Sequence, residues 1–157
     1  MPLQRLVQPK VPITARITLF DGSKVDGEFF LGPAARNNGT ETLPELLNDN
    51  ARSFIPFQTE DGVVLLNRTT IRTVEFDSFE LLRIFETEPE FIYDLHIVLS
   101  TEVEEVMFKG QCYGGDKNPE ARRPIDLLNA PDVFLMVHIT GTILLLNKTA
   151  ISHVVLE

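Results

Sequence analysis

The amino-acid sequence predicts an all-β protein made of two tandem copies of one small, five-stranded bent barrel. The first observation is a repeated stretch: VVLLNRTTIRTVEF at residues 63–76 returns as ILLLNKTAISHVVL at residues 143–156. The second is that other similar segments recur in the same order in both halves of the chain. The third is a series of short segments in which apolar and polar residues alternate, as in strands with one buried face.

The spacing between matched residues divides the chain into two copies and a linker. Asn67 matches Asn147, while ELLN at residues 45–48 matches DLLN at residues 126–129 with one extra position between them. The spacing changes only between periodic segments, as expected of loop insertions that leave strand pairing intact. We therefore expect a first copy over residues 1–76, a linker over residues 77–90 and a second copy over residues 91–157.

Each copy is predicted to begin with a hairpin of two strands. The alternating apolar residues of VPITARITL in the first copy and of FIYDLHIVL in the second copy place one face of each strand toward a core. DGS at residues 21–23 is a turn signal, which the longer acidic segment STEVEE replaces in the second copy. Gly27 and Gly110 lie inside the following strands, where glycine indicates a bend or bulge that curls the sheet.

A short helix is predicted next, between the second and third strands of each copy. LPELLND and RPIDLLNAP each carry a proline near the start, which suits a first helical turn. Asn48 and Asn129 are expected to end these helices. Three strands then close each copy: SFIPFQT, GVVLLN and TIRTVEF in the first, and VFLMVHI, TILLLN and AISHVVL in the second.

The linker has apolar residues at helical spacing, namely Phe79, Leu82 and Phe85, with acidic residues elsewhere. This pattern fits a helix that leads into the second copy. A continuation of the preceding strand is the alternative, and the pattern leaves both open.

Composition narrows the classes of function. With 43% hydrophobic and 24% charged residues, the chain has the composition of a folded protein, and its net charge of −9 disfavours nucleic-acid binding through clustered cations. The single cysteine, Cys112, permits no disulfide framework and is interpreted as buried packing. Because no stretch approaches the length of a signal peptide or the roughly 20 apolar residues of a membrane span, we expect a cytoplasmic protein without membrane contact.

Both halves resemble the Sm-like family, the strongly bent five-stranded barrels of spliceosomal Sm and bacterial host-factor proteins. DGVVLLNRTTIRTV and TGTILLLNKTAISHV resemble the second family motif: a glycine, apolar residues, a polar pair and an isoleucine that leads the last strand. The hairpin ITLFDGSKVDGEFF is similar to the first motif. The chain departs from the family in having Asn-Arg or Asn-Lys where Arg-Gly is usual, and in lacking a clear Asp-x-x-Asn signature before the third strand.

The unbroken apolar runs in the closing hairpins predict an interface. Both faces of such a strand need cover, and one barrel of roughly 70 residues covers only one face well. The resemblance implies that strand edges pair between subunits, so that three chains form a homo-oligomeric, pseudo-hexameric ring. The alternative is that the runs pack inside one chain, copy against copy. The residues expected at the interface are Val63, Val64, Leu65, Leu66, Ile143, Leu144, Leu145 and Leu146.

The polar pairs after these runs are candidates for ligand contact. Asn67 with Arg68, and Asn147 with Lys148, lie where the resemblance implies contact with RNA or another ligand. The alternative is a tight turn, in which asparagine tolerates a positive φ and the cation is solvated. An RNA-binding regulator of the host-factor type is therefore the alternative function.

No catalytic motif accompanies these pairs. The three histidines, His96, His138 and His153, are too far apart for a metal-binding spacing, and Glu102, Glu104 and Glu105 crowd one turn. We therefore expect a non-enzymatic assembly or interaction module that uses no metal or cofactor.

Overall fold

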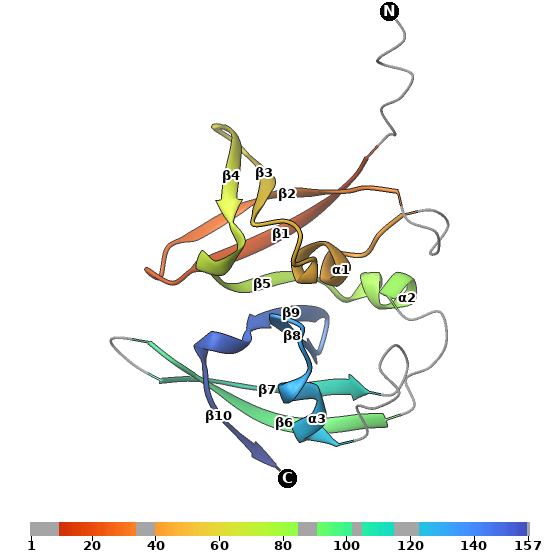
Figure 1. Cartoon of the computed structure of the whole chain (residues 1–157), viewed down its shortest axis with the longest axis vertical. Coiled ribbons are helices and arrows are strands. Elements are labelled where there is room, and N and C mark those ends of the chain that lie inside the picture. Colours follow the sequence, from red (N-terminus) through yellow and green to blue (C-terminus); the bar gives the residue numbers. More distant parts are fainter. Residues whose placement is uncertain (1–9, 34–39, 85–90, 102–104, 115–122, 157) are drawn as a thin grey trace, which may run out of the picture.

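The computed structural model describes residues 10–33, 40–84, 91–101, 105–114 and 123–156, and it confirms the all-β class. Ten strands form one antiparallel sheet in the order β10-β6-β7-β8-β9-β5-β1-β2-β3-β4 (Figure 1). The prediction of two bent barrels is not confirmed, because the ten strands form one continuous sheet that is not closed into a barrel. The two halves join where β5 pairs with β9, at the centre of the sheet order.

Each half contributes five strands with the same pairing pattern. The first strand of a half lies between the second and the fifth, and the third and fourth strands extend the sheet beyond the second. In the first half these are β1 (Val11–Leu19), β2 (Lys24–Leu31), β3 (Phe54–Thr59), β4 (Gly62–Asn67) and β5 (Ile71–Asp77). In the second half they are β6 (Phe91–Ser100), β7 (Glu105–Gly114), β8 (Phe134–Ile139), β9 (Thr142–Asn147) and β10 (Ile151–Leu156).

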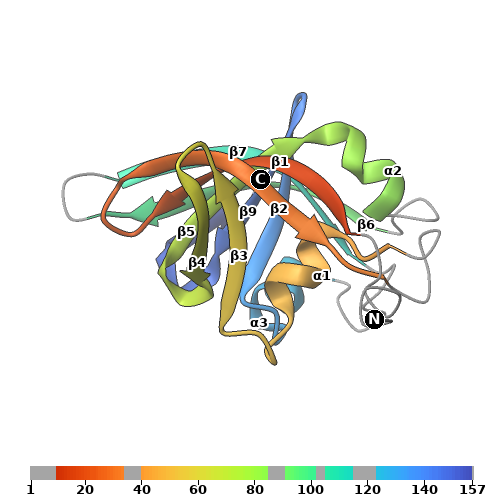
Figure 2. The same ribbon diagram turned by 90° about the horizontal axis from the view of Figure 1, so that it is seen from above.

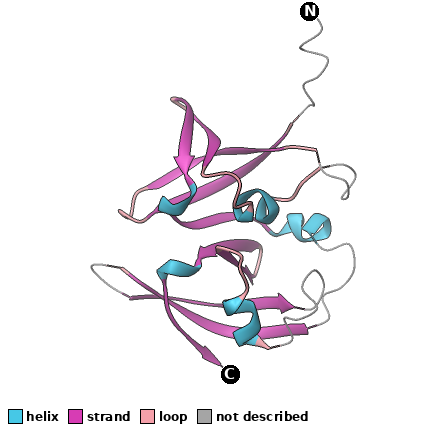
Figure 3. Cartoon of the chain, viewed as in Figure 1, coloured by secondary structure: helices cyan, strands magenta, loops and turns pink. Residues whose placement is uncertain are grey.

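The predicted helices lie between the second and third strands of each half. They are α1 (Leu43–Asn48) and α3 (Pro124–Asn129), which end at the two asparagines expected to end them. Figure 2 shows both helices on the same side of the molecule, and Figure 3 shows how little of the chain is helical. Single 3-10 turns, η3 (Arg68–Thr70) and η5 (Lys148–Ala150), precede the last strand of each half.

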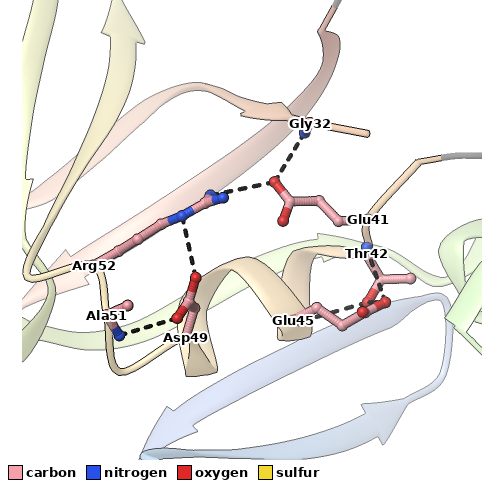
Figure 4. Close-up of polar contacts among 7 residues, drawn as sticks. All are labelled: Gly32, Glu41, Thr42, Glu45, Asp49, Ala51 and Arg52. Carbon is pink, nitrogen blue, oxygen red and sulfur yellow. Dashed lines mark hydrogen bonds and ion pairs between the residues drawn. The ribbon is translucent and has the colours of Figure 1, made fainter. Parts of the chain in front are cut away.

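A polar cluster fixes α1 against the end of β2 (Figure 4). The buried Glu41 Oε1 accepts hydrogen bonds from the Gly32 N–H at 2.8 Å and from Arg52 Nη1 at 3.4 Å. Arg52 also forms an ion pair with Asp49 at 3.2 Å, just beyond the helix. Glu41 directly precedes the capping box of α1, and its partner Gly32 directly follows β2, so this bond ties the start of the helix to the end of the strand.

The interior glycines of β2 and β7 allow the third strand of each half to approach closely. A Cβ at Gly27 would lie 2.7 Å from the Phe57 ring, and a Cβ at Gly110 would lie 2.6 Å from a methyl group of Val137. Both distances are shorter than real carbon contacts. The recurrence of glycine therefore reflects a close strand approach in both halves.

The linker is helical in its described part. The 3-10 turn η4 (Ser78–Glu80) runs into α2 (Leu81–Ile84), which favours the helix over a continued strand. The apolar face differs from the predicted one, since Phe79 is exposed and Ile84 is buried. Phe85 lies outside the described residues.

Two hydrophobic cores share the β8–β9 hairpin. The first core is lined by β1, β2, β3, β5 and α1, and it also receives Phe134, Ile143 and Leu145 from the second half. The second core contains Leu135, Leu144 and Leu146 from the same hairpin. Alternate side chains of one hairpin thus enter opposite cores, as the period of a strand requires.

No helix in the described part of the chain has the length and apolar character needed to cross a membrane.

Candidate self-association surface

The apolar run in β9 is buried on both of its faces within the chain. Ile143, Leu144, Leu145 and Leu146 are all buried. Leu144 and Leu146 point into the core of their own half, and Ile143 and Leu145 point into the core of the other half, whose strand β5 pairs with β9. For this copy of the run, packing of one half against the other is the arrangement in the structure.

The matching run in β4 lies at the free edge of the sheet. Leu65 is 67% exposed, whereas its counterpart Leu145 is 0% exposed. Val63 and Val64 are also exposed, and Leu66 is half-buried. The runs are similar in sequence, so the difference comes from the strand beside them: β9 has β5, and β4 ends the strand order.

The strands before these runs, β3 and β8, show the same difference in exposure. Phe134 is 3% exposed and inserts into the first core, whereas Phe54 is 58% exposed. Ile55 and Phe57 point the other way, into their own core. The outer face of the β3–β4 hairpin is therefore an uncovered copy of a face that the structure buries in β8–β9.

The opposite edge of the sheet, β10, is also uncovered. Leu156 is 62% exposed, whereas its counterpart Phe76 in β5 is 4% exposed because β9 lies beside it. Beside Leu156 is an open hollow of about 280 Å³, lined by residues of β6 and by Pro124 at the start of α3. Each edge strand therefore lacks the neighbour that its counterpart has at the centre of the sheet. β4 lacks a strand such as β5, and β10 lacks a strand such as β9.

The helices α1 and α3 also differ in how far they are buried. Leu46 and Leu47 of α1 are fully buried, whereas their counterparts Leu127 and Leu128 of α3 are only half-buried. The α1 helix packs near β8, a strand of the other half. No strand occupies the corresponding place beside α3 in the described residues.

Side-chain hydrogen bonds of Asn147 and Asn48 cross the junction between the halves. Asn147 Nδ2 donates to the Ile71 carbonyl at 2.9 Å, and Asn48 Oδ1 accepts from the Phe134 N–H at 2.8 Å. Sequence reasoning assigned Asn48 only to the end of a helix. Its match with Asn129 at the same helical position was the signal that could have indicated a further role.

The two candidate cations are bonded to the helices. The Arg68 guanidinium is buried, and its Nη1 donates to the Leu47 carbonyl at 3.0 Å. Lys148 Nζ donates to the carbonyls of Leu127 and Ala130, both at 2.9 Å. Each cation thereby satisfies carbonyls at the C-terminal end of a helix, where positive charge is favourable. Neither is the solvated cation of the tight-turn interpretation.

Burial also affects the ionisation of Lys148. It lowers the pKa of the ammonium below its usual value, and the carboxylate of Asp132 opposes part of this shift. The two carbonyl acceptors nevertheless provide good partners for a protonated amine.

Asn67 and Asn147 cap the 3-10 turns that follow them. In each case the side-chain oxygen accepts the N–H of the threonine two residues later, at 3.1 Å for Thr69 and 3.0 Å for Thr149. Both asparagines have negative φ, −73° and −63°, so these turns do not use the positive φ that asparagine tolerates. The backbone conformation is that of an N-cap.

The side chains of Cys112, Tyr113 and His138 are buried or hydrogen-bonded within the fold. Cys112 is buried, and this burial raises its pKa to about 12, so the thiolate is scarce at neutral pH. The Tyr113 hydroxyl lies 2.7 Å from His138 Nδ1 and links β7 to β8. In the described residues, no group of three or more His, Cys, Asp or Glu side chains is arranged to hold a metal ion.

Comparisons of the chain with models of protein families, with curated proteins and with solved structures find no match.

Proposed function

We propose that this protein is a non-enzymatic assembly module with two Sm-like halves, which associates with copies of itself through the exposed edges of its sheet. One observation carries the proposal: the apolar run that β5 covers in β9 is exposed in β4. An uncovered strand edge with large apolar side chains is a site for pairing with another chain. The recurrence of the same five-strand order in both halves supports a repeated unit.

The assembly that best fits two such units per chain is a closed ring of three chains. Each chain supplies two units already joined at β5 and β9, so three chains provide the six units implied by the Sm-like resemblance. Closure leaves no free edge, whereas an open row of chains keeps one at each end.

The solution mass tests this proposal. Size-exclusion chromatography with light scattering, repeated over a range of protein concentrations, is expected to give three times the 17.7 kDa chain mass. The Leu65→Asp variant is expected to reduce that mass, because a buried carboxylate opposes pairing. A wild-type mass of 17.7 kDa at all concentrations would contradict self-association.

The RNA-binding alternative gains no support from Arg68 and Lys148, since both cations are bonded to helix carbonyls. A mobility-shift assay with mixed single-stranded RNA at low salt separates the two functions. RNA binding that weakens with added salt would favour the alternative. The absence of a shift at low salt would count against it.

A further inference from the structure

The β5–β9 junction inside the chain is a template for the junction between chains. We infer that β4 of one molecule pairs antiparallel with β10 of a second copy, in the register that β9 and β5 use. The inference rests on the proposed self-association and adds the partner strand, its register and the side chains that select it. Two facts support it: β4 and β10 are the two edges of one sheet, and they are the sequence counterparts of β9 and β5.

The template fixes the register residue by residue. In the chain, Val74 lies opposite Leu145, Glu75 opposite Leu144 and Phe76 opposite Ile143. The matched positions between molecules place Val154 opposite Leu65, Val155 opposite Val64 and Leu156 opposite Val63. All of these residues are apolar, so each pair buries carbon against carbon, with successive pairs on alternate faces of the sheet.

The outer face of the β3–β4 hairpin fits the uncovered side of the second half. Within the chain, Phe134 inserts among the residues of the first core, near α1. The same placement between molecules brings Phe54 toward Leu127 and Leu128 of α3, which are half-buried and lack such a neighbour among the described residues. The open hollow beside Leu156 lies on this side of the second half.

Two asparagines complete the junction. Asn147 Nδ2 donates to the Ile71 carbonyl, whereas the Nδ2 of Asn67 has no partner among the described residues. In the template its partner is the Ile151 carbonyl of the second copy. Likewise Asn129 of the second copy, whose side chain is exposed, matches Asn48 and is placed to accept the Phe54 N–H of the first molecule. Both contacts are directional, so they select one register.

Pairing of β4 with β4 of another molecule explains less of the structure. A symmetric pair would leave β10, Leu156 and the side of α3 uncovered in both molecules. It would also bring Phe54 toward another β3–β4 hairpin, which has no helix at its edge. The head-to-tail arrangement covers both edges of every molecule in a closed ring.

Two blocked variants test the inference when they are mixed. Leu65→Asp blocks β4 and leaves β10 free, and Leu156→Asp blocks β10 and leaves β4 free. Both positions are exposed in the chain, so each variant is expected to keep its fold. Each alone is expected to be monomeric, and an equimolar mixture is expected to give a dimer with one chain of each kind, resolved by native mass spectrometry with one variant isotopically labelled.

The outcomes separate this inference from the proposed function. If wild type associates but Leu156→Asp alone still forms a dimer, the head-to-tail junction is overturned while self-association stands. A monomeric wild type refutes the proposed function itself. A mixture of the blocked variants that stays monomeric, beside an associating wild type, also overturns the junction.

Disulfide trapping tests the register separately. In a Cys112→Ala background, a Val64→Cys chain that also carries Leu156→Asp is mixed with a Val155→Cys chain that also carries Leu65→Asp. The two cysteines lie opposite each other in the inferred register, and oxidation is expected to link the two chains. The matched control replaces Val64→Cys with Val63→Cys, which moves the thiol to the other face of the strand. Equal or stronger linkage in the control would overturn the register.

Discussion

The side-chain oxygen of Asn48 accepts a hydrogen bond from the backbone N–H of Phe134, which lies 86 residues later in the chain, at 2.8 Å. This bond connects the last residue of α1 to the first residue of β8. It therefore fixes where the β8–β9 hairpin meets the first half, and it holds the Phe134 ring in the first core.

Replacement of Asn48 by alanine is expected to lower the free energy of unfolding by about 1–3 kcal/mol, because the Phe134 N–H loses its acceptor. The matched control is Asn129→Ala, at the same helical position in the second half, where the side chain is exposed. In the monomeric Leu65→Asp background, urea unfolding should show the loss for Asn48 and a change within about 0.5 kcal/mol for Asn129. Equal effects would contradict the role given to Asn48.

Leu145 and Leu65 occupy matched positions with opposite environments. Leu145→Ala is expected to lower the free energy of unfolding by about 2–5 kcal/mol, because it leaves a cavity in the first core. Leu65→Ala, measured in the Leu156→Asp background to prevent association, should change it by less than about 0.5 kcal/mol. Denaturant titration followed by circular dichroism gives both values, and similar losses would show that β4 is covered in the monomer.

Gly27 is expected to tolerate no side chain. In Gly27→Ala the new methyl group collides with the Phe57 ring and with the Gln58 backbone, so β3 must move away from β2. A loss of about 1–3 kcal/mol in the free energy of unfolding is expected from such overpacking. Gly32→Ala is the control, since its nearest neighbour is the Glu41 carboxylate at an ordinary 3.4 Å. A neutral Gly27→Ala would show that β2 and β3 are not held this closely.

Cys112 should react only when the chain unfolds. Burial raises its pKa to about 12 from an ordinary value of 9.0, so the folded state holds the proton more tightly than the unfolded state. The thiol contribution to stability is therefore constant below about pH 9 and is lost as the pH rises toward 12. Labelling with a thiol reagent at neutral pH should be slow in the native protein and fast in urea, and the Cys112→Ala variant should lack the added alkaline loss. Rapid native labelling would contradict the burial.

The local parts of the fold were predictable because strand periodicity is local. Ile13, Ala15 and Ile17 alternate in the sequence and are buried as expected. The joining of the halves was not predictable in the same way, since β4 and β9 carry similar apolar runs. Only the pairing of β9 with β5 decides which run is covered, and that pairing is a tertiary contact.

The candidate site shows a second limit of sequence reasoning. Arg68 and Lys148 follow apolar strands at a turn, a pattern typical of solvated or ligand-binding cations. Their side chains instead reach back to the ends of α1 and α3, more than fifteen residues earlier in the chain. Long aliphatic stems allow such a reach, and the sequence contains no signal for its direction.

The sharing of the β8–β9 hairpin between two cores has a consequence for how the molecule melts. If the second half opened alone, Phe134, Ile143 and Leu145 would leave the first core, and water would reach residues that are dry in the native state. Neither half can lose its order without weakening the other. Heat is therefore expected to unfold the monomeric Leu65→Asp chain in one cooperative calorimetric transition, with equal calorimetric and van't Hoff enthalpies.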